Sequence, residues 1–363
     1  MTTPPTSKRA FTVADVAREA QVSKAQAARA LGGYGAVSDR VMARVTEAAE
    51  RLNYRPNQLA RSMNTGRSQT LGVVVGDIEN PYFSLALRGI SDLAKEQGYD
   101  VILTNTDEKL GAEQDAVRVL VDKRVDGLIV VPCEPCQIDH LRQVVEEGRV
   151  LTLFDREIEG LGVESVSASF VGAAREATQA LLALGHRRIA YLTSIHGQPP
   201  YRRGDILGVS PVAQRIAGME EAFTRAGVDF DPGLVKFNAV GAEQVASIMA
   251  ELLDVKEPAT AVVASDNLIA LAVLKECRRR SLGVPRDLSL LMYDDFPWTE
   301  LVDPPLTVIA QPVYEMGQEV ARRTIARIRG QEPGPMPGFE ARLVPRDSFA
   351  PPGEDTRQGF CDN

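Results

Sequence analysis

Apolar positions near the start of the chain recur at helical spacing over three short stretches between residues 11 and 53. Each stretch places its apolar side chains on one face, as helices of a small domain do. The inward positions are Val13, Val16, Ala17 and Ala20 in the first stretch, Ala27, Ala30 and Leu31 in the second, and Val41, Val45, Ala48 and Leu52 in the third. The pattern predicts a three-helix domain, with Thr12 and Ser23 placed to cap the first two helices.

From residue 70 onward, short apolar runs alternate with amphipathic stretches. The runs typical of buried strands are 71–75, 99–104, 126–131, 149–154, 187–192, 260–265 and 288–293. The stretches with helical spacing are 84–97, 112–124, 171–184, 212–226, 242–254 and 267–282. Continuous apolar strands with helical crossovers predict parallel sheets covered on both faces, here in two lobes. A ligand would then bind in the cleft, beyond the carboxyl ends of the strands.

These patterns divide the chain into five segments. We expect a disordered start at 1–10, the three-helix domain at 11–53 and a linker at 54–69. The two-lobed body follows at 70–350, with a disordered tail at 351–363. The tail lacks the heptads of a tetramerising helix.

Composition fits an ordinary soluble protein, with 44% apolar and 25% charged residues in 363. The N-terminus has no apolar run resembling a signal sequence, and no run is long enough to span a membrane, so we expect a cytoplasmic protein with no membrane partner. Four cysteines are too few for a disulfide framework. Cys133 and Cys136 have metal-like spacing but no second pair follows, so we favour an ordinary loop and expect no metal or cofactor.

Charge is distributed unevenly along the chain. The net charge of the whole is -8, yet residues 1–67 hold eleven Lys or Arg and five Asp or Glu, a net of +6 that leaves -14 for the rest. A basic head on an acidic body suits a module that binds a polyanion, because only the head is drawn to phosphates. On charge alone, a merely solvated basic face remains an equal alternative.

The second predicted helix has a narrow basic face. Lys24, Ala25, Ala28 and Arg29 lie opposite its apolar side. Such a face can enter the major groove of DNA, where Arg or Lys reads guanine edges and an alanine methyl meets a thymine methyl. Periodicity alone does not separate a helix-turn-helix from other three-helix domains.

Several motifs, in order, resemble the LacI family of bacterial transcription regulators. They are TVADVAREAQVSKAQAARAL, VSDRVMARVTEAAERLNYRPNQLARSM, TLGVVVGDIENPYF, LGHRRIAYLT, QRIAGMEEAF, GVPRDLSLLMYDDF and PLTVIAQP, between residues 12 and 312. The resemblance implies an α/β fold, with a helix-turn-helix head followed by a two-lobed, periplasmic-binding-protein-like body of parallel doubly wound sheets. It also implies a homodimer that binds palindromic double-stranded operator DNA.

The resemblance assigns roles within the head and linker. Lys24, Ala25 and Arg29 take base-reading positions, while Ser23, Asn57 and Arg61 would contact phosphates. Residues 55–63 match a hinge that is helical only on cognate DNA, which agrees with its being too short for a stable isolated helix. In it, Leu59 and Met63 stand four residues apart, with Met63 where the family has a leucine wedge. Packing of both on the body is the alternative.

Two departures in the head and two in the body qualify this likeness. Gln21 replaces the usual turn glycine, where a left-handed backbone would cost about 1 kcal/mol. Met63 is a less rigid wedge than leucine. In the body, Met292 replaces a glycine and Ala168 begins a pair that is commonly Asp-Asn, so the pocket chemistry can differ from that of relatives.

Candidate effector residues follow predicted strands. Tyr82 and Phe83 are expected to form two stacked rings, which suit the face of a sugar or a base. Fixed Asp and Arg side chains can form hydrogen bonds to pairs of hydroxyl groups. The candidates are Tyr82, Phe83, Asp155, Arg156, Arg215, Asp266 and Asp294, all expected at strand ends or in the loops beyond them. Lobe core for the rings, and ion pairs between lobes for the charged groups, are the alternatives. Tyr201, in a long loop, would either close over the site or be exposed.

Together these features predict a repressor controlled by a small sugar or polyol. No nucleophile, metal or phosphate-binding motif of an enzyme is found, so we expect no catalysis. A periplasmic-type sugar-binding protein without DNA binding is the alternative for the body alone. The sequence leaves open whether the effector is an inducer or a corepressor.

Overall fold

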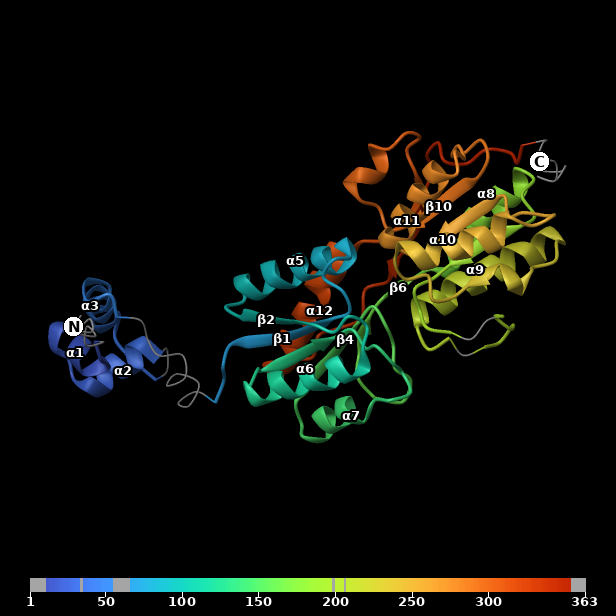
Figure 1. Cartoon of the computed structure of the whole chain (residues 1–363). Helices are drawn as coiled ribbons and strands as arrows, with labels where there is room; N and C mark the ends of the chain where they lie inside the picture. The colour runs from blue at the N-terminus through green and yellow to red at the C-terminus, as the bar shows by residue number, and fades with distance from the viewer. Residues whose placement is uncertain (1–10, 33–34, 55–65, 198–199, 206, 354–363) are drawn as a thin grey trace, which may run out of the picture. The chain divides into compact units, whose positions relative to one another are not determined.

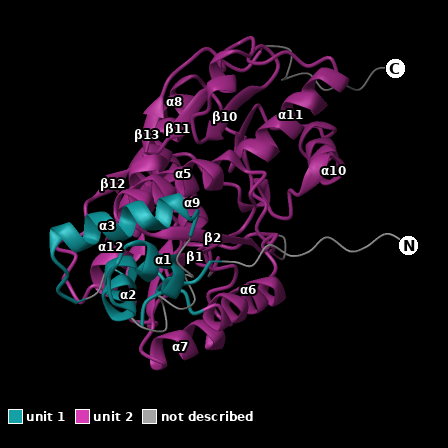
Figure 2. Cartoon of the chain, turned by 90° about the vertical axis from the view of Figure 1, so that its left-hand side faces the viewer, with its two compact units in different colours: residues 1–70, 124–126 teal, residues 71–123, 127–363 magenta. Residues whose placement is uncertain are grey.

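The computed structural model describes residues 11–32, 35–54, 66–197, 200–205 and 207–353. The chain divides into two compact units (Figure 2): residues 1–70 with 124–126, and residues 71–123 with 127–363. The predicted hinge and the two chain ends lie outside the described residues.

The head consists of three helices, α1 (Val13–Glu19), α2 (Lys24–Gly32) and α3 (Asp39–Arg51). Alanine and valine dominate its core, so the helices approach closely around small side chains. The buried residues are Val16, Ala17, Ala20, Ala27, Ala30, Val45, Ala48 and Ala49. The helical pattern of the sequence is confirmed, with Leu31, Val41 and Leu52 partly buried at the rim of this core.

Side-chain caps set the start of the first two helices. The Thr12 amide donates to the Asp15 carboxylate at 3.0 Å. At α2, the amide of Ser23 donates to Gln26 Oε1 and the amide of Gln26 donates to the Ser23 hydroxyl, both at 3.1 Å. This reciprocal capping box satisfies two amides that the first turn leaves free. Gln21 between the helices has φ 52°, which confirms the left-handed turn predicted there.

The first lobe of the body is built on a five-stranded sheet in the order β2-β1-β3-β4-β5. Strands β1, β3, β4 and β5 run parallel. The strands are β1 (Thr70–Val75), β2 (Asp100–Asn105), β3 (Gly127–Val130), β4 (Val150–Phe154) and β5 (Ser165–Val166). Helices α5 (Pro81–Glu96) and α12 (Val313–Ile328) pack on one face, with α6 (Leu110–Asp122) and α7 (Asp139–Glu146) on the other (Figure 1).

The second lobe carries a six-stranded sheet in the order β13-β11-β10-β9-β7-β8. Only β13 is antiparallel to its neighbour. The strands are β7 (Ile189–Leu192), β8 (Val235–Lys236), β9 (Ala261–Ala264), β10 (Ser289–Tyr293), β11 (Thr307–Ala310) and β13 (Arg342–Val344). Two helix pairs accompany it: α8 (Val171–Ala183) with α9 (Ser210–Ala226), and α10 (Gly241–Leu253) with α11 (Asn267–Arg279).

The chain passes between the two lobes three times. Strands β6 (Ala168–Ser169) and β12 (Phe339–Glu340) pair with each other in the connecting segments. The third passage joins β11 to α12, which crosses α5 so closely that a Cβ at Gly317 would overlap the carbonyl oxygen of Ala86. Ala168, noted as a departure, therefore belongs to a connection between the lobes.

The parallel two-lobed architecture is confirmed, and all seven predicted strands and all six predicted body helices are present. The prediction missed α7 and α12, together with β11, β13 and the two-residue strands. Across the described ranges, none of the helices has the length and apolarity needed to span a membrane.

Candidate functional site

One pocket in the cleft of the body collects all seven effector candidates. The space between its walls, with open solvent at the mouth included, is about 530 Å³. The predicted residues that line it are Tyr82, Phe83, Asp155, Arg156, Arg215, Asp266 and Asp294. Residues that the sequence did not single out also line it, among them Asn80, Glu108, Thr193, Ser194 and Gln311.

On the first lobe, Asp155 and Tyr82 form one wall. Asp155 follows β4 with φ 67°, a left-handed turn that directs the chain away from the strand. The Tyr82 hydroxyl donates to Asp155 Oδ1 at 2.8 Å. The Tyr82 ring stacks on Phe154, with centroids 6.0 Å apart and an interplanar angle of 28°. Burial raises the pKa of the Asp155 carboxyl.

The prediction that Tyr82 and Phe83 form two stacked rings was wrong. Their centroids lie 5.1 Å apart at an interplanar angle of 78°, an edge-to-face contact. Successive residues of a helix point in directions about 100° apart, so neighbouring rings in the first turn of α5 cannot lie parallel. Both rings are buried and both line the pocket, so the rings are lobe core and pocket wall at once.

Arg156 is held rigidly at the edge of the pocket. Its Nη1 and Nη2 donate to the two carboxylate oxygens of Glu108 at 2.6 and 2.7 Å, and Nη1 also donates to the Pro132 carbonyl at 2.9 Å. A bidentate pair of this kind fixes the plane of the guanidinium. All these groups belong to the first lobe, so Arg156 makes an ion pair within one lobe instead of a bridge between the two.

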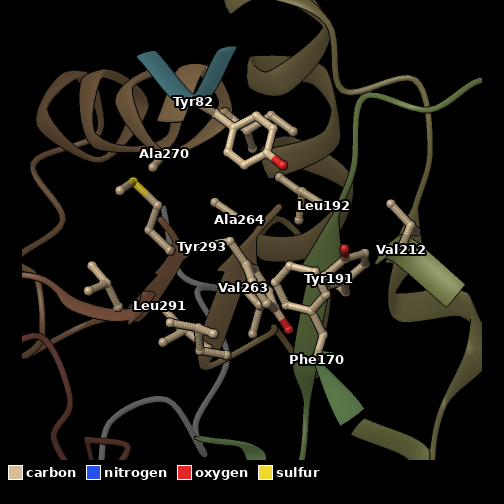
Figure 3. Close-up of a cluster of buried hydrophobic side chains, with 14 of the residues drawn as sticks. Tyr82, Phe170, Tyr191, Leu192, Val212, Val263, Ala264, Ala270, Leu291 and Tyr293 are labelled. Carbon is tan, nitrogen blue, oxygen red and sulfur yellow. The ribbon is translucent and has the colours of Figure 1, made fainter. Parts of the chain in front are cut away.

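Arg215 occupies the centre of the second-lobe wall. Its guanidinium carbon lies 4.3 Å from the ring centroid of Phe170 and 4.0 Å from that of Tyr293. Figure 3 shows Phe170 and Tyr191 within the buried cluster that also contains Tyr293. Nη1 donates to the Ser265 carbonyl at 2.9 Å. Nε of Arg215 is buried and has no hydrogen-bond partner among the described residues.

Arg215 lies in the helix predicted at 212–226, and not at a strand end or in a loop as the other charged candidates do. It sits within α9, in the second turn of the helix that begins at Ser210. The guanidinium can still reach the strand ends because the Arg side chain is long and buries its stem between aromatic rings. Tyr82 likewise lies in the first turn of α5.

Asp294 and Asp266 complete the second-lobe wall. Asp294, with φ 71°, follows β10 and accepts a hydrogen bond from Gln311 Nε2 at 2.6 Å. Burial raises the pKa of the Asp294 carboxyl to about 6. Asp266 caps α11 by accepting from the Ile269 amide at 2.9 Å, and burial raises its pKa also.

The pocket therefore carries more negative than positive charge. Four carboxylates line it against two guanidiniums, and the Glu108 carboxylate is already paired with Arg156. Of the remaining three, Asp155 also lies next to Arg156, with 3.6 Å between its Oδ2 and the arginine Nε. The positive charge of Arg215 acts on Asp155, Asp266 and Asp294 alike, lowering each pKa against the effect of burial. Carboxylates accept hydrogen bonds and an arginine donates them, so this set can bind paired hydroxyl groups from both sides.

Tyr201 does not close over this pocket. It is buried within the second lobe, with its ring edge-on to Phe230 and Phe237, and its hydroxyl donates to Glu220 at 3.3 Å. Residues 202–205, which follow it in the same stretch, are exposed, as one of the two alternatives expected. An aromatic side chain in a long polar loop was here a core residue.

The outer face of α2 matches the expected reading surface. Lys24 and Ala25 are exposed, and Ala28 and Arg29 are partly exposed. Arg29 folds back on its own helix, where its Nε donates to the Ala25 carbonyl at 3.2 Å. The Ser23 hydroxyl, predicted as a phosphate contact, accepts the capping bond from Gln26 and remains exposed. Asn57, Leu59, Arg61 and Met63 lie outside the described residues.

Cys133 and Cys136 lie in the loop after β3. Within the residues that the structure describes, no group of three or more metal-binding side chains gathers, and Cys133, Cys136 and Cys277 are free thiols. Burial raises the pKa of the Cys133 thiol to about 12, so it is protonated at neutral pH.

Comparison with known proteins agrees with both the helix-turn-helix head and the two-lobed body. Residues 12–57 match the model described as bacterial regulatory proteins, lacI family, and residues 178–349 match the periplasmic binding protein-like domain. The chain is 34% identical to the ribose operon repressor of Bacillus subtilis (strain 168), over 88% of this chain and 92% of the relative. It is 31% identical to the HTH-type transcriptional repressor CytR of Escherichia coli (strain K12), over 90% and 92%.

A solved structure, the transcriptional regulator CelR-cellobiose complex, superposes with a TM-score of 0.64 at 28% identity, covering 93% of this chain and 99% of that one. Fold and site together define a helix-turn-helix regulator with a periplasmic-binding-protein-like receptor body. The chain belongs to the LacI family and is a DNA-binding transcriptional repressor. A sugar-binding protein without DNA binding, the alternative from the body alone, is set aside by the match of the head.

Proposed function

We propose that this repressor binds a palindromic operator as a homodimer and that a neutral sugar or polyol in the body pocket controls its operator affinity. The observation that supports the effector class is the set of Asp155, Asp294 and Arg215 around one pocket walled by Tyr82. These acceptors, one donor and a ring face suit a molecule with several hydroxyl groups. Action on DNA would place the protein in the cytoplasm.

Charge favours a neutral effector over an anionic one. A sugar phosphate or sugar acid would meet a pocket lined by four carboxylates and two guanidiniums, one of which already pairs with Glu108. In a poorly solvated pocket, bringing like charges together is costly unless one of them takes up a proton. The names of two relatives support the sugar class, since one is the ribose operon repressor and another was solved with cellobiose.

On the DNA side, α2 would read the operator with Lys24, Ala25 and Arg29. Lys24 and Ala25 face solvent, and the net charge of +6 over residues 1–67 would draw the head to phosphates. Ser23, together with Asn57 and Arg61, would contact the backbone, and Leu59 and Met63 would enter the minor groove. The relatives named above are transcriptional regulators, which supports a role without catalysis.

A thermal-shift screen tests the effector class. Neutral pentoses, hexoses, disaccharides and polyols are compared with sugar phosphates and sugar acids on the purified full chain, because a ligand of the folded state raises its melting temperature. We expect stabilisation by a neutral compound and none by its phosphorylated counterpart. The Arg215→Met variant, which keeps a long apolar stem, is the matched control and should not respond. Stabilisation only by anionic compounds would contradict the proposal.

A further inference from the structure

Asp126, the residue before β3, joins the end of the linker to the first sheet by hydrogen bonds. Its Oδ1 accepts from the Ser68 amide at 2.7 Å and from the Ser68 hydroxyl at 3.0 Å. Its Oδ2 accepts from the Gln69 amide at 2.8 Å. The Asp126 amide in turn donates to the Thr70 carbonyl at 2.8 Å. One residue thus makes four hydrogen bonds to three successive residues of the chain that leads from the head. We call this set the linker clamp.

The linker clamp imposes a particular backbone path. Gln69 has φ 53°, a left-handed conformation that a non-glycine residue adopts at a cost. The Asp126 carboxylate accepts hydrogen bonds before that turn and the Asp126 amide donates one to the Thr70 carbonyl after it, so together they can hold the turn in place. Ser68, Gln69 and Asp126 are half-buried, so these charge-assisted bonds are only partly in competition with water. Residues 124–126 also group with residues 1–70 in one compact unit.

The residue after Asp126 is fixed on the opposite side. A Cβ at Gly127 would lie 2.9 Å from both Thr324 Cγ2 and Ile328 Cδ1, so β3 meets α12 with no spare room. Thr324 is itself tied to β4, because its hydroxyl donates to Thr152 Oγ1 at 2.9 Å. Asp126 therefore stands on backbone that cannot shift without moving α12.

The other end of β3 reaches the effector pocket. Residues 126 to 132 form one short run whose far end is the Pro132 carbonyl, which accepts from Arg156 Nη1. Arg156 lines the pocket. An extended run of this length spans roughly 20 Å. The linker clamp and the carbonyl that holds Arg156 thus lie just beyond the two ends of β3.

We propose that Asp126 is a positioning residue for operator recognition, which holds the end of the linker at one place on the body. A specific complex must order the linker in one conformation, and a clamp lowers the entropy lost in that ordering. Non-specific binding rests on phosphate contacts alone and does not require that order. The inference uses the DNA-binding function of the family and does not depend on the effector class.

The test compares specific and non-specific DNA binding of the full chain. The probes are a duplex selected from a random pool by the wild-type protein and a scrambled duplex of the same length. Asp126→Ala removes every side-chain bond of the clamp, and Asp126→Asn keeps an oxygen for Ser68 while turning an amide toward the Gln69 amide. Asp122→Asn, an exposed acid four residues upstream, is the matched control for charge.

We expect Asp126→Ala to lose about tenfold in affinity for the selected duplex and Asp126→Asn about threefold, with the scrambled duplex and the Asp122→Asn control unchanged. Equal losses on both duplexes, or none on either, would overturn the proposal. If Asp126→Ala melts early, Ser68→Ala carries the test, since it removes one bond from a half-buried site. It should weaken binding to the selected duplex and leave binding to the scrambled duplex unchanged. In the Asp126→Asn background, Ser68→Ala should lower the affinity further only by the loss of the Ser68 hydroxyl bond.

Discussion

The reading helix and the effector pocket use charge in opposite ways. On α2, Lys24 stands in solvent above a core of alanine and valine, so its charge acts at a distance and is screened by salt. In the pocket, Arg215 and Asp294 are buried, so their charges act only on what enters, and the carboxyl of Asp294 responds to pH. The difference teaches that DNA binding should depend on ionic strength, while effector binding should depend on protonation.

Arg215→Met should produce the largest change. It removes a buried guanidinium whose charge acts on three acidic groups of the pocket, and truncating one partner of a buried charged set costs roughly 2 to 5 kcal/mol of binding. We expect effector affinity to fall at least about 100-fold by calorimetry, with the ligand found in the thermal-shift screen. DNA affinity without effector should not change. A loss of less than about threefold would show that Arg215 only packs between aromatic rings.

Asp294→Asn should change how the stability of the body depends on pH, because it removes a carboxyl with a raised pKa. The folded pKa of Asp294 is about 6, above its unfolded value, so the folded state holds an extra proton between about pH 4 and pH 6. This contribution to stability is present below pH 4 and is lost as pH rises through 6.

Relative to wild type, the Asn variant should therefore gain about 2 to 3 kcal/mol above pH 6 and almost nothing at pH 4, as measured by urea unfolding without ligand. Asn keeps an oxygen that can accept from Gln311. A gain that is independent of pH would mean that the carboxyl of Asp294 titrates normally.

Arg29→Ala tests the other side of the comparison. We expect a loss of about 1 to 3 kcal/mol on the selected operator and much less on scrambled DNA, because a base contact discriminates and a phosphate contact does not. Anisotropy titrations at two salt concentrations measure both. Arg18→Ala, which removes an exposed charge from α1, is the control for charge alone. Equal losses of Arg29→Ala on both duplexes would reassign Arg29 to the backbone.

Gln21→Gly should give the smallest effect. The left-handed turn between α1 and α2 costs a non-glycine residue about 1 kcal/mol, part of which glycine returns through its freer unfolded chain. We expect the head to gain about 0.5 kcal/mol, measured by its melting in circular dichroism. Asn53→Gly, also left-handed but at a residue that tolerates it, should gain less. A destabilised Gln21→Gly would mean that the turn is unstrained.

The alternation of apolar runs with amphipathic stretches was enough to predict seven strands of the body and its cleft. It worked because parallel strands are apolar throughout, so their carboxyl ends, with Asp155 and Asp294, could be located. It missed α12, because a helix that follows the second lobe but packs on the first gives no sign of its partner in the sequence.

Pocket residues were predictable where a motif also indicated their role, and a place within a motif was not enough by itself. Glu108 and Gln311 were missed because their roles come from pairing with Arg156 and Asp294 across the fold. The mutual orientation of Tyr82 and Phe83 was also beyond the sequence, since it depends on where α5 begins. The role of Gln26 was also beyond the sequence, since only the structure shows it completing the cap with Ser23.

One titration tests the central claim that the pocket controls the head. Operator affinity of the full chain is measured by anisotropy with and without saturating amounts of the compound that stabilises the body, for the wild type and for Arg215→Met. We predict that the compound changes the wild-type operator Kd at least about fivefold, in either direction, and leaves the Kd of the variant unchanged. A compound that binds the wild-type pocket yet leaves operator affinity unchanged would contradict the account.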